Sequence, residues 1–136
     1  MALTAETLLP GDAVTGTCLA LTAPISFWGG VDPASGTIID ARHPERGQNI
    51  AGKILALPGT IGSSSASAVL LELVRAGKAP AALLMDAPDA ILLLGLVVAR
   101  EMGWPTPPAW RLPAAEQAAL AGRGITISAE GLMTVA

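Results

Sequence analysis

The middle of the chain alternates two apolar strands with two helices, and this order constrains the fold more than any other feature. Residues 53–57 and 81–85 are short apolar runs bounded by turn residues, a pattern typical of buried strands. Residues 62–77 begin with serines and end at Gly77 beside cations, which predicts a helix with both ends marked. Asp86, Pro88 and Asp89 open a second helix that extends to about residue 102.

The flanking segments add shorter elements. We expect strands over 13–22 and 36–40, an exposed loop over 24–33, a turn over 43–47, an extended segment over 104–113, a short helix over 114–121, and a closing hairpin of 125–128 with 132–135. The chain has 136 residues, which is typical of one domain. The fold class predicted for residues 1–136 is therefore α/β, a single three-layer β/β/α domain built on a compact sheet or barrel with helices.

The composition indicates a partner chain. Hydrophobic residues make up 51% of the sequence and charged residues only 14%, with a mean hydropathy of +0.56. So few charges leave apolar surface that another chain is expected to cover. The longest apolar run, 90–99, is too short for a membrane span, and the first residues lack the pattern of a signal peptide, so we expect a cytoplasmic protein. A net charge of -3 without a basic run argues against nucleic-acid binding.

Metal chemistry by this chain alone is not expected. Cys18 is the only cysteine and His43 the only histidine, so neither a disulfide nor a thiolate-ligated cluster is possible within the chain. We expect Cys18 to be a core residue and His43 to fix a turn through a backbone hydrogen bond. Any metal therefore comes mostly from a partner.

The sharpest candidate site is the serine run after Gly62. A strand is expected just before Gly62, Ser63, Ser64 and Ser65, and a helix just after them. Unpaired backbone N–H groups at a helix start attract a carboxylate or an oxyanion, and a serine there can act as a base if its alkoxide is stabilised. Serines are also common helix caps, and the run by itself favours capping.

An aromatic turn is the second candidate. Ser26, Phe27, Trp28, Gly29 and Gly30 place two aromatic side chains beside two glycines, which suits either a pocket wall or a hydrophobic turn that closes one end of a barrel.

The remaining candidates are predicted to be structural. Asp32 is expected to cap the aromatic turn. Trp104 and Trp110 lie among prolines and are expected to be surface clamps or partner contacts.

Several motifs together resemble the small subunit of the aconitase X family over about residues 10–103. They are Ser26-Phe-Trp-Gly-Gly-Val-Asp-Pro-x-x-Gly36, Ile39-Asp-x-x-His-Pro-x-x-Gly47, Gly52-Lys53, Gly62-Ser63 through Ser67 with Val69-Leu70, and Gly77-Lys-Ala-Pro80. The resemblance implies a swivelling β/β/α domain similar to the C-terminal domain of aconitase. It implies a hydro-lyase (dehydratase) for a small β-hydroxy acid, with Ser63 as catalytic base. It also implies a large subunit that carries an iron or iron–sulfur centre.

Two activities occur in that family, cis-3-hydroxy-L-proline dehydratase and phosphomevalonate dehydratase. Relatives often have a cation where this chain has Thr60-Ile61, and a glycine where it has Ala66. Loss of the cation disfavours a phosphorylated substrate. We therefore expect conversion of cis-3-hydroxy-L-proline to Δ1-pyrroline-2-carboxylate, with the substrate carboxylate held by the N–H groups of Ser64 and Ser65 and the hydroxyl leaving with the aid of the partner's iron. The alternatives are a phosphomevalonate dehydratase small subunit, a non-catalytic module that closes the partner's site, and a lone small-molecule binding protein.

Overall fold

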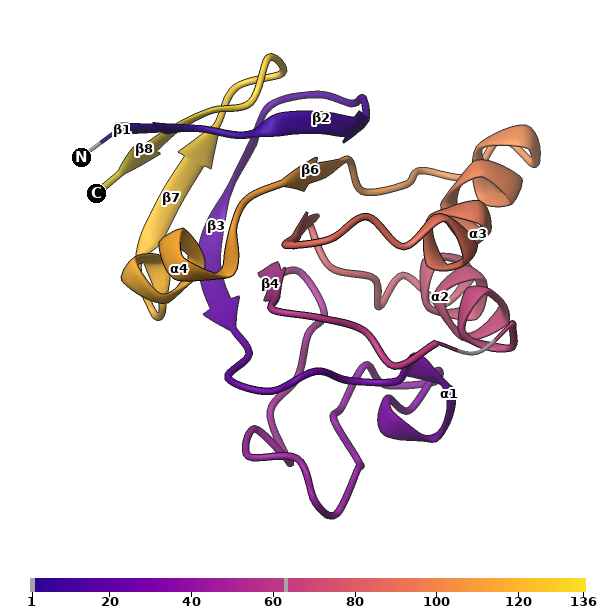
Figure 1. The fold of residues 1–136 in the computed structure, drawn as a ribbon. Helices are drawn as coiled ribbons and strands as arrows, with labels where there is room; N and C mark the ends of the chain where they lie inside the picture. The colour runs from indigo at the N-terminus through magenta and orange to yellow at the C-terminus, as the bar shows by residue number, and fades with distance from the viewer. Residues whose placement is uncertain (1, 63) are drawn as a thin grey trace.

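One mixed sheet organises the protein, which a computed structural model describes over residues 2–62 and 64–136. The eight strands of these residues lie in the order β1-β8-β7-β3-β4-β5-β6-β2. They are β1 (Ala2–Thr4), β2 (Glu6–Leu9), β3 (Val14–Ala20), β4 (Ile54–Leu57), β5 (Ala82–Met85), β6 (Ala109–Arg111), β7 (Gly124–Ile127) and β8 (Leu132–Val135). Because β1 and β2 follow each other in the chain yet pair at opposite ends of this order, the sheet curls into a nearly closed barrel (Figure 1).

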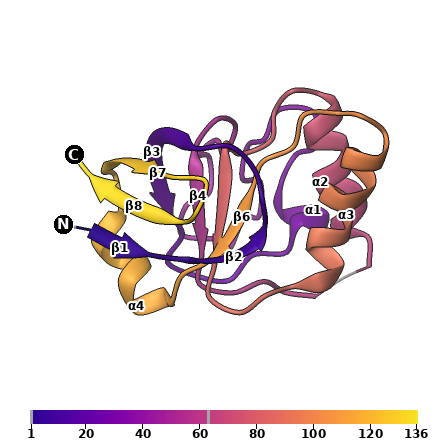
Figure 2. The same ribbon diagram turned by 90° about the horizontal axis from the view of Figure 1, so that it is seen from above.

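The layers follow from the connections between strands. Strands β3, β4, β5 and β6 are parallel neighbours, whereas β7 and β8 form an antiparallel hairpin next to β3. The crossovers carry α2 (Ala66–Arg75) and α3 (Ala90–Glu101). Figure 2 shows both helices on one side of the parallel strands and the β7–β8 hairpin with β1 on the other. The predicted three-layer β/β/α fold is confirmed.

Two hydrophobic cores share the central strands. Along β4, Leu55 and Leu57 belong to the core beneath the helices, and Ile54 and Ala56 belong to the core inside the barrel. All four residues are buried, as are all four of β5. Residues of a strand point alternately to its two faces, so a strand with cores on both sides must be apolar throughout. This explains the two apolar runs that mark β4 and β5 in the sequence.

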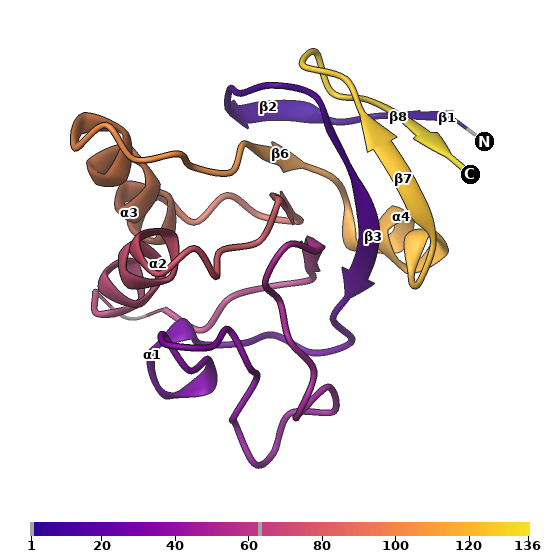
Figure 3. The same ribbon diagram turned by 180° about the vertical axis from the view of Figure 1, so that it is seen from behind.

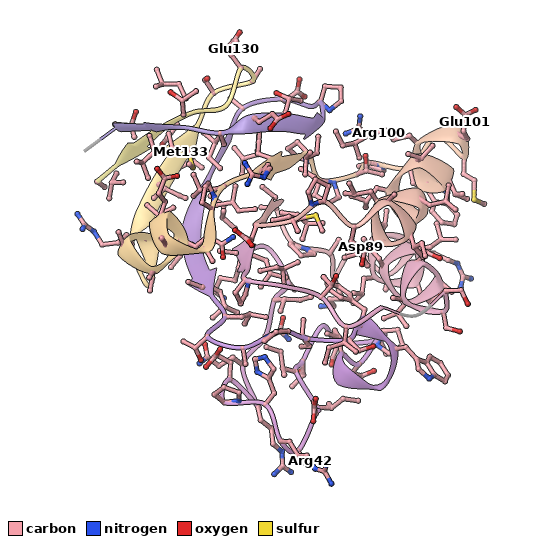
Figure 4. All side chains as sticks on the ribbon, in the orientation of Figure 1. Arg42, Asp89, Arg100, Glu101, Glu130 and Met133 are labelled. Carbon is pink, nitrogen blue, oxygen red and sulfur yellow. The ribbon has the colours of Figure 1, made fainter. Side chains whose placement is uncertain are left out.

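The predicted strand over residues 36–40 is wrong. In this segment Thr37 and Ile38 make only isolated bridges, to Asn49 and Val31. Gly36 adopts a positive φ of 81°, which turns the chain at the start of the segment and prevents a longer ladder. Figure 4 shows Arg42 at the outer tip of the loop that results between β3 and β4.

The two N-terminal strands were not predicted. Five of the eight residues 2–9 are Ala or Leu, which favour helices, and pairing with β8 and β6 makes the segment two strands. The predicted helix over 114–121 is confirmed as α4 (Ala114–Gln117) and a 3₁₀ turn, Ala118–Leu120. Figure 3 shows this helix beside β3 and β7, away from α2 and α3. None of the helices in the described ranges is long and apolar enough to cross a membrane.

Candidate functional site

The parallel strands bring both candidate loops to one edge of the sheet. The segments that follow β3, β4 and β5 are held together there by backbone bonds. Leu21 N donates to Ala56 O at 3.0 Å, and Asp86 N donates to Leu57 O at 3.2 Å. In open α/β sheets, ligands bind outside the carboxyl ends of the strands. The loops at this edge are therefore the first place to look for function.

The serine run and the aromatic turn lie side by side at this edge. Ile25, just before the turn, forms a parallel bridge with Thr60. Ile61 N donates to Ile25 O at 3.0 Å, and Ile25 N donates to Gly59 O at 3.4 Å. Two motifs that are far apart in the sequence are thus joined through the backbone just before each begins.

The described residues of the serine run are open to solvent. Gly62, Ser64 and Ser65 are exposed, and a Cβ added to Gly62 would have no neighbour within 4 Å. Ser65 stands at the cap position of α2, but its side chain does not make the capping hydrogen bond. Ser67 Oγ donates to Ser64 O at 3.0 Å. Ser63 lies outside the described residues, so its role as a base stays a prediction.

The aromatic turn has a buried and an exposed half. It is the tight turn α1 (Phe27–Gly30), in which Trp28 (ψ 116°) and Gly29 (φ 75°) depart from helical backbone angles. Phe27 is buried in the core beneath the helices, whereas Trp28 is 63% exposed. Phe27 and the buried Gly30 anchor the turn, and Ser26 is partly buried at its start. Trp28 and Gly29 are the members of the turn that present surface to a ligand or a partner.

Asp89 joins the start of α3 to the loop that leads from β4 to α2. This loop carries the serine run, and we call it the serine loop. The Oδ1 atom of Asp89 accepts hydrogen bonds from Ile91 N and Leu92 N, both at 3.0 Å, which confirms the predicted helix start. Its Oδ2 accepts a 2.8 Å bond from Thr60 Oγ1. In Figure 4, Asp89 lies at the inner end of α3. The cap was readable in the sequence, but the bond to Thr60 was not, because 29 residues separate the partners.

His43 and Glu45 hold the segment that leads into the aromatic turn. The buried His43 ring accepts a bond from Glu45 N at Nδ1, 3.1 Å away, so Nε2 carries the proton and donates to Ala23 O at 3.0 Å. The Glu45 carboxylate accepts bonds from both the backbone N–H and the hydroxyl of Thr22. His43 thus bonds to backbone as expected, while the part played by Glu45 was missed.

Two further residues are structural, although Asp32 caps the turn that follows it and not the aromatic turn as predicted. Asp32 accepts bonds from Ala34 N and Ser35 Oγ, and these bonds lower the pKa of its carboxyl group. Cys18 is buried inside the barrel, and burial raises the pKa of its thiol to about 11, so it is not a thiolate at neutral pH.

The prediction for Trp110 is wrong, because this residue is fully buried inside the barrel. Strand β6 pairs with a neighbour on each side, so it is an inner strand and its side chains enter a core. Trp104 is partly buried against the core beneath the helices.

No group of three His, Cys, Asp or Glu residues among residues 2–62 and 64–136 is arranged to hold a metal ion. The iron or iron–sulfur centre that the resemblance implies therefore does not fit the described side chains.

Fold and site define a small α/β barrel domain with one open, serine-bearing edge. The chain belongs to the aconitase X swivel domain family, whose model matches residues 2–133. This range extends the resemblance seen in the sequence to nearly the whole chain, including the C-terminal residues in which no motif was placed.

Named relatives and solved structures agree with this family. The chain is 50% identical over 97 residues to cis-3-hydroxy-L-proline dehydratase of Pseudomonas aeruginosa, a match that covers 71% of this chain and 17% of that protein. It is 42% identical over 89 residues to the phosphomevalonate dehydratase small subunit of Thermococcus gammatolerans, covering 65% of this chain and 68% of that one. The crystal structure of Thermococcus kodakaraensis aconitase X in its holo-form superposes with a TM-score of 0.83 at 28% identity, covering 100% of this chain and 98% of that one.

Proposed function

We propose that this chain is the small subunit of an aconitase X-type hydro-lyase, which works with a large subunit to dehydrate a small β-hydroxy carboxylic acid. The observation that carries the proposal is the pairing of the exposed serine loop with the aromatic turn at the carboxyl edge of the sheet. The names of the relatives, which are dehydratases, support it.

Cis-3-hydroxy-L-proline is the substrate that we favour. The identity of 50% to the proline dehydratase, against 42% to the phosphomevalonate dehydratase subunit, supports this choice. The local charge supports it too. Thr60, which stands where relatives often have a cation, donates its hydroxyl hydrogen to the Asp89 carboxylate 2.8 Å away. A carboxylate next to the serine loop disfavours a phosphate group there, because like charges repel.

The chemistry assigned to this chain is proton transfer and orientation. Ser63, as an alkoxide, takes the proton α to the carboxylate, and the β-hydroxyl leaves as hydroxide. This hydroxide and the proton now on the Ser63 hydroxyl together form the released water, which restores the alkoxide. The enamine that forms tautomerises to Δ1-pyrroline-2-carboxylate. The N–H groups of Ser64 and Ser65 hold the carboxylate at the start of α2. The partial positive charge at the N-terminal end of α2 favours both the substrate carboxylate and the Ser63 alkoxide.

The open edge calls for a partner. Elimination from a carbon acid needs a site that excludes water, and the exposed Trp28 and Gly62 do not provide one by themselves. Because the described residues do not fit an iron centre, we assign the iron to the large subunit and derive no step through it. The match covers only 17% of the Pseudomonas aeruginosa relative, so the rest of that longer chain is large enough to contain a counterpart of the large subunit.

The test is to reconstitute the chain with its large subunit and to measure kcat on cis-3-hydroxy-L-proline and on phosphomevalonate. We expect turnover of the proline substrate, and faster turnover of phosphomevalonate would make the alternative substrate correct. Ser63→Ala should lower kcat by about 100-fold or more, because general-base catalysis typically contributes that much. Thermal stability and assembly should change little, since at most one helix cap, worth about 1 kcal/mol, is lost.

Ser64→Ala and Ser65→Ala are the matched controls. Their assigned role uses backbone N–H groups, which alanine keeps, so their effects on kcat should be smaller than that of Ser63→Ala. If Ser63→Ala keeps a near-normal kcat, the chain is a non-catalytic module that closes the large subunit's site. A chain that turns over substrate without any partner would make the proposed division of labour wrong.

A further inference from the structure

Helix α3 is apolar on both of its faces. Its inner residues Leu92, Gly95, Leu96 and Ala99 are buried against the rest of the domain. Five large apolar side chains point outward, and we call them the outer face of α3. They are Ile91 (50% exposed), Leu94 (54%), Val97 (42%), Val98 (38%) and Met102 (53%). Single exposed apolar residues are ordinary, but a contiguous group marks a surface that another molecule covers.

The outer face forms one continuous stripe. Ile91, Leu94, Val98 and Met102 follow each other at intervals of three or four residues, which aligns side chains along a helix. No charged residue occurs between Ala90 and Ala99. In Figure 4, Asp89 marks the inner end of α3 and Glu101 its outer end.

The stripe starts at the candidate site. Asp89, two residues before Ile91, accepts the hydrogen bond from Thr60, and the residue after Thr60 is Ile61, which is 56% exposed. Ile61 in turn is bonded to Ile25 at the base of the aromatic turn, where Trp28 is 63% exposed. The aromatic turn, the loop before α2 and α3 therefore each carry an exposed apolar side chain, and hydrogen bonds join the three segments.

The size of the stripe selects the kind of partner. A helix of this length is about 18 Å long and about 10 Å wide, so a symmetric contact between two copies of α3 covers far less than the roughly 800 Å² per partner of a standard interface. A larger partner protein that contacts both the loops at the carboxyl ends of the strands and the outer face of α3 can reach the area of a standard interface. In two relatives the matching segment is 17% and 15% of a longer chain, so it is part of a much larger protein there.

We propose that the outer face of α3 is a docking surface for the large subunit, which covers it with an apolar surface of its own and reaches over the serine loop at the same time. This inference rests on the proposed function, since it needs a large subunit. The outer face of α3 is then part of the apolar surface that, from the low content of charged residues, another chain is expected to cover.

The test measures the Kd between the purified chain and the large subunit. Leu94→Glu places a charge in the middle of the stripe and should raise Kd about tenfold or more, as loss of a central apolar contact does. Leu132→Glu is the matched control. Leu132 is 51% exposed, close to the exposure of Leu94, but it lies on β8 in the opposite layer, so its Kd should stay within about twofold (Figure 2). Circular dichroism must show that both variants fold.

Each other outcome overturns the proposal. If the unmodified chain binds the large subunit and Leu94→Glu binds equally well, the docking surface is wrong while the proposed function stands. If the unmodified chain binds no large subunit, both are wrong. If the chain alone is a dimer that Leu94→Glu converts to a monomer, the occupant of the stripe is a second copy of this chain.

Discussion

At the scale of single residues, Asp89 has the widest reach at the site. One carboxylate caps α3 through two backbone N–H groups and accepts the hydroxyl of Thr60 from the serine loop. The loop that carries the proposed base is therefore fixed to a helix start rather than to its own strand alone. His43 and Glu45 likewise fix the segment before the aromatic turn, through hydrogen bonds with Ala23 and Thr22.

Replacing Asp89 should therefore cost more than replacing Thr60. Asp89→Ala removes the cap, worth about 1 kcal/mol, and the bond to Thr60, worth about another 1 kcal/mol, so the free energy of unfolding should fall by about 2 kcal/mol. Thr60→Val removes only the second bond and should cost about half as much. Urea denaturation of both variants measures the difference. Equal losses would mean that the cap contributes nothing to stability.

At the scale of elements, the contact between α2 and α3 depends on Gly95. A Cβ at this position would lie 2.5 Å from Ser67 O, a backbone atom of the first turn of α2. The two helices can approach this closely only where α3 has no side chain. Since α2 starts just after the serine loop, this contact also helps to position the proposed active site.

Gly95→Ala should destabilise the protein, although alanine is the better helix former by about 1 kcal/mol. Forcing the helices apart typically costs 1–3 kcal/mol, which exceeds that gain. Val97→Ala, on the outer face of the same helix, is the control and should change stability by about 0.5 kcal/mol or less. Thermal unfolding of the isolated chain distinguishes the two. A Gly95→Ala variant that melts at a higher temperature would show that the helices can separate freely.

At the scale of the whole molecule, the first nine residues close the barrel. Strand β1 pairs with β8 and strand β2 pairs with β6, and between them Ala5 N donates to Gly131 O at 2.9 Å. The core inside the barrel, which contains the fully buried Trp110, has this segment as one wall. Of this segment, the partly buried Leu8 and Leu9 pack against the other core, beneath α2 and α3.

Deleting residues 2–9 should open the barrel and expose its inner core. In a Trp28→Phe background, where the most exposed tryptophan is removed, the fluorescence emission should shift to the red as water reaches Trp110. Urea unfolding should lose its single cooperative transition, because one of two cores no longer packs. The full-length Trp28→Phe chain is the control. Unchanged emission and a single sharp transition after the deletion would show that the barrel is stable without this closure.

The sequence by itself determined the elements whose signals are local. The apolar runs of β4 and β5, the cap at Asp89 and the stop at Gly77 each depend on neighbours within a few residues, so they were predicted correctly. The same holds for the hairpin, which was predicted over 125–128 with 132–135 and is formed by β7 (Gly124–Ile127) and β8 (Leu132–Val135). The family motifs around the aromatic turn and the serine run were readable for the same reason. Among these motif residues, Ser63, on which the proposed mechanism depends, lies outside the described residues.

Only the tertiary structure decided what depends on partners far along the chain. Residues 2–9 became strands because β8 and β6 offered them unpaired edges, against their own helix-favouring composition. Trp110 moved from an expected surface contact to the barrel core because β6 gained a neighbour on each side. No charged residue in the sequence between Ala90 and Ala99 distinguishes one face of α3 from the other, and the packing of one face against α2 decided which residues were left outside. The hydrophobic effect is non-directional. The sequence therefore shows which residues of α3 are apolar, but only the assembled sheet and helices decide which of them are buried and which remain on the surface.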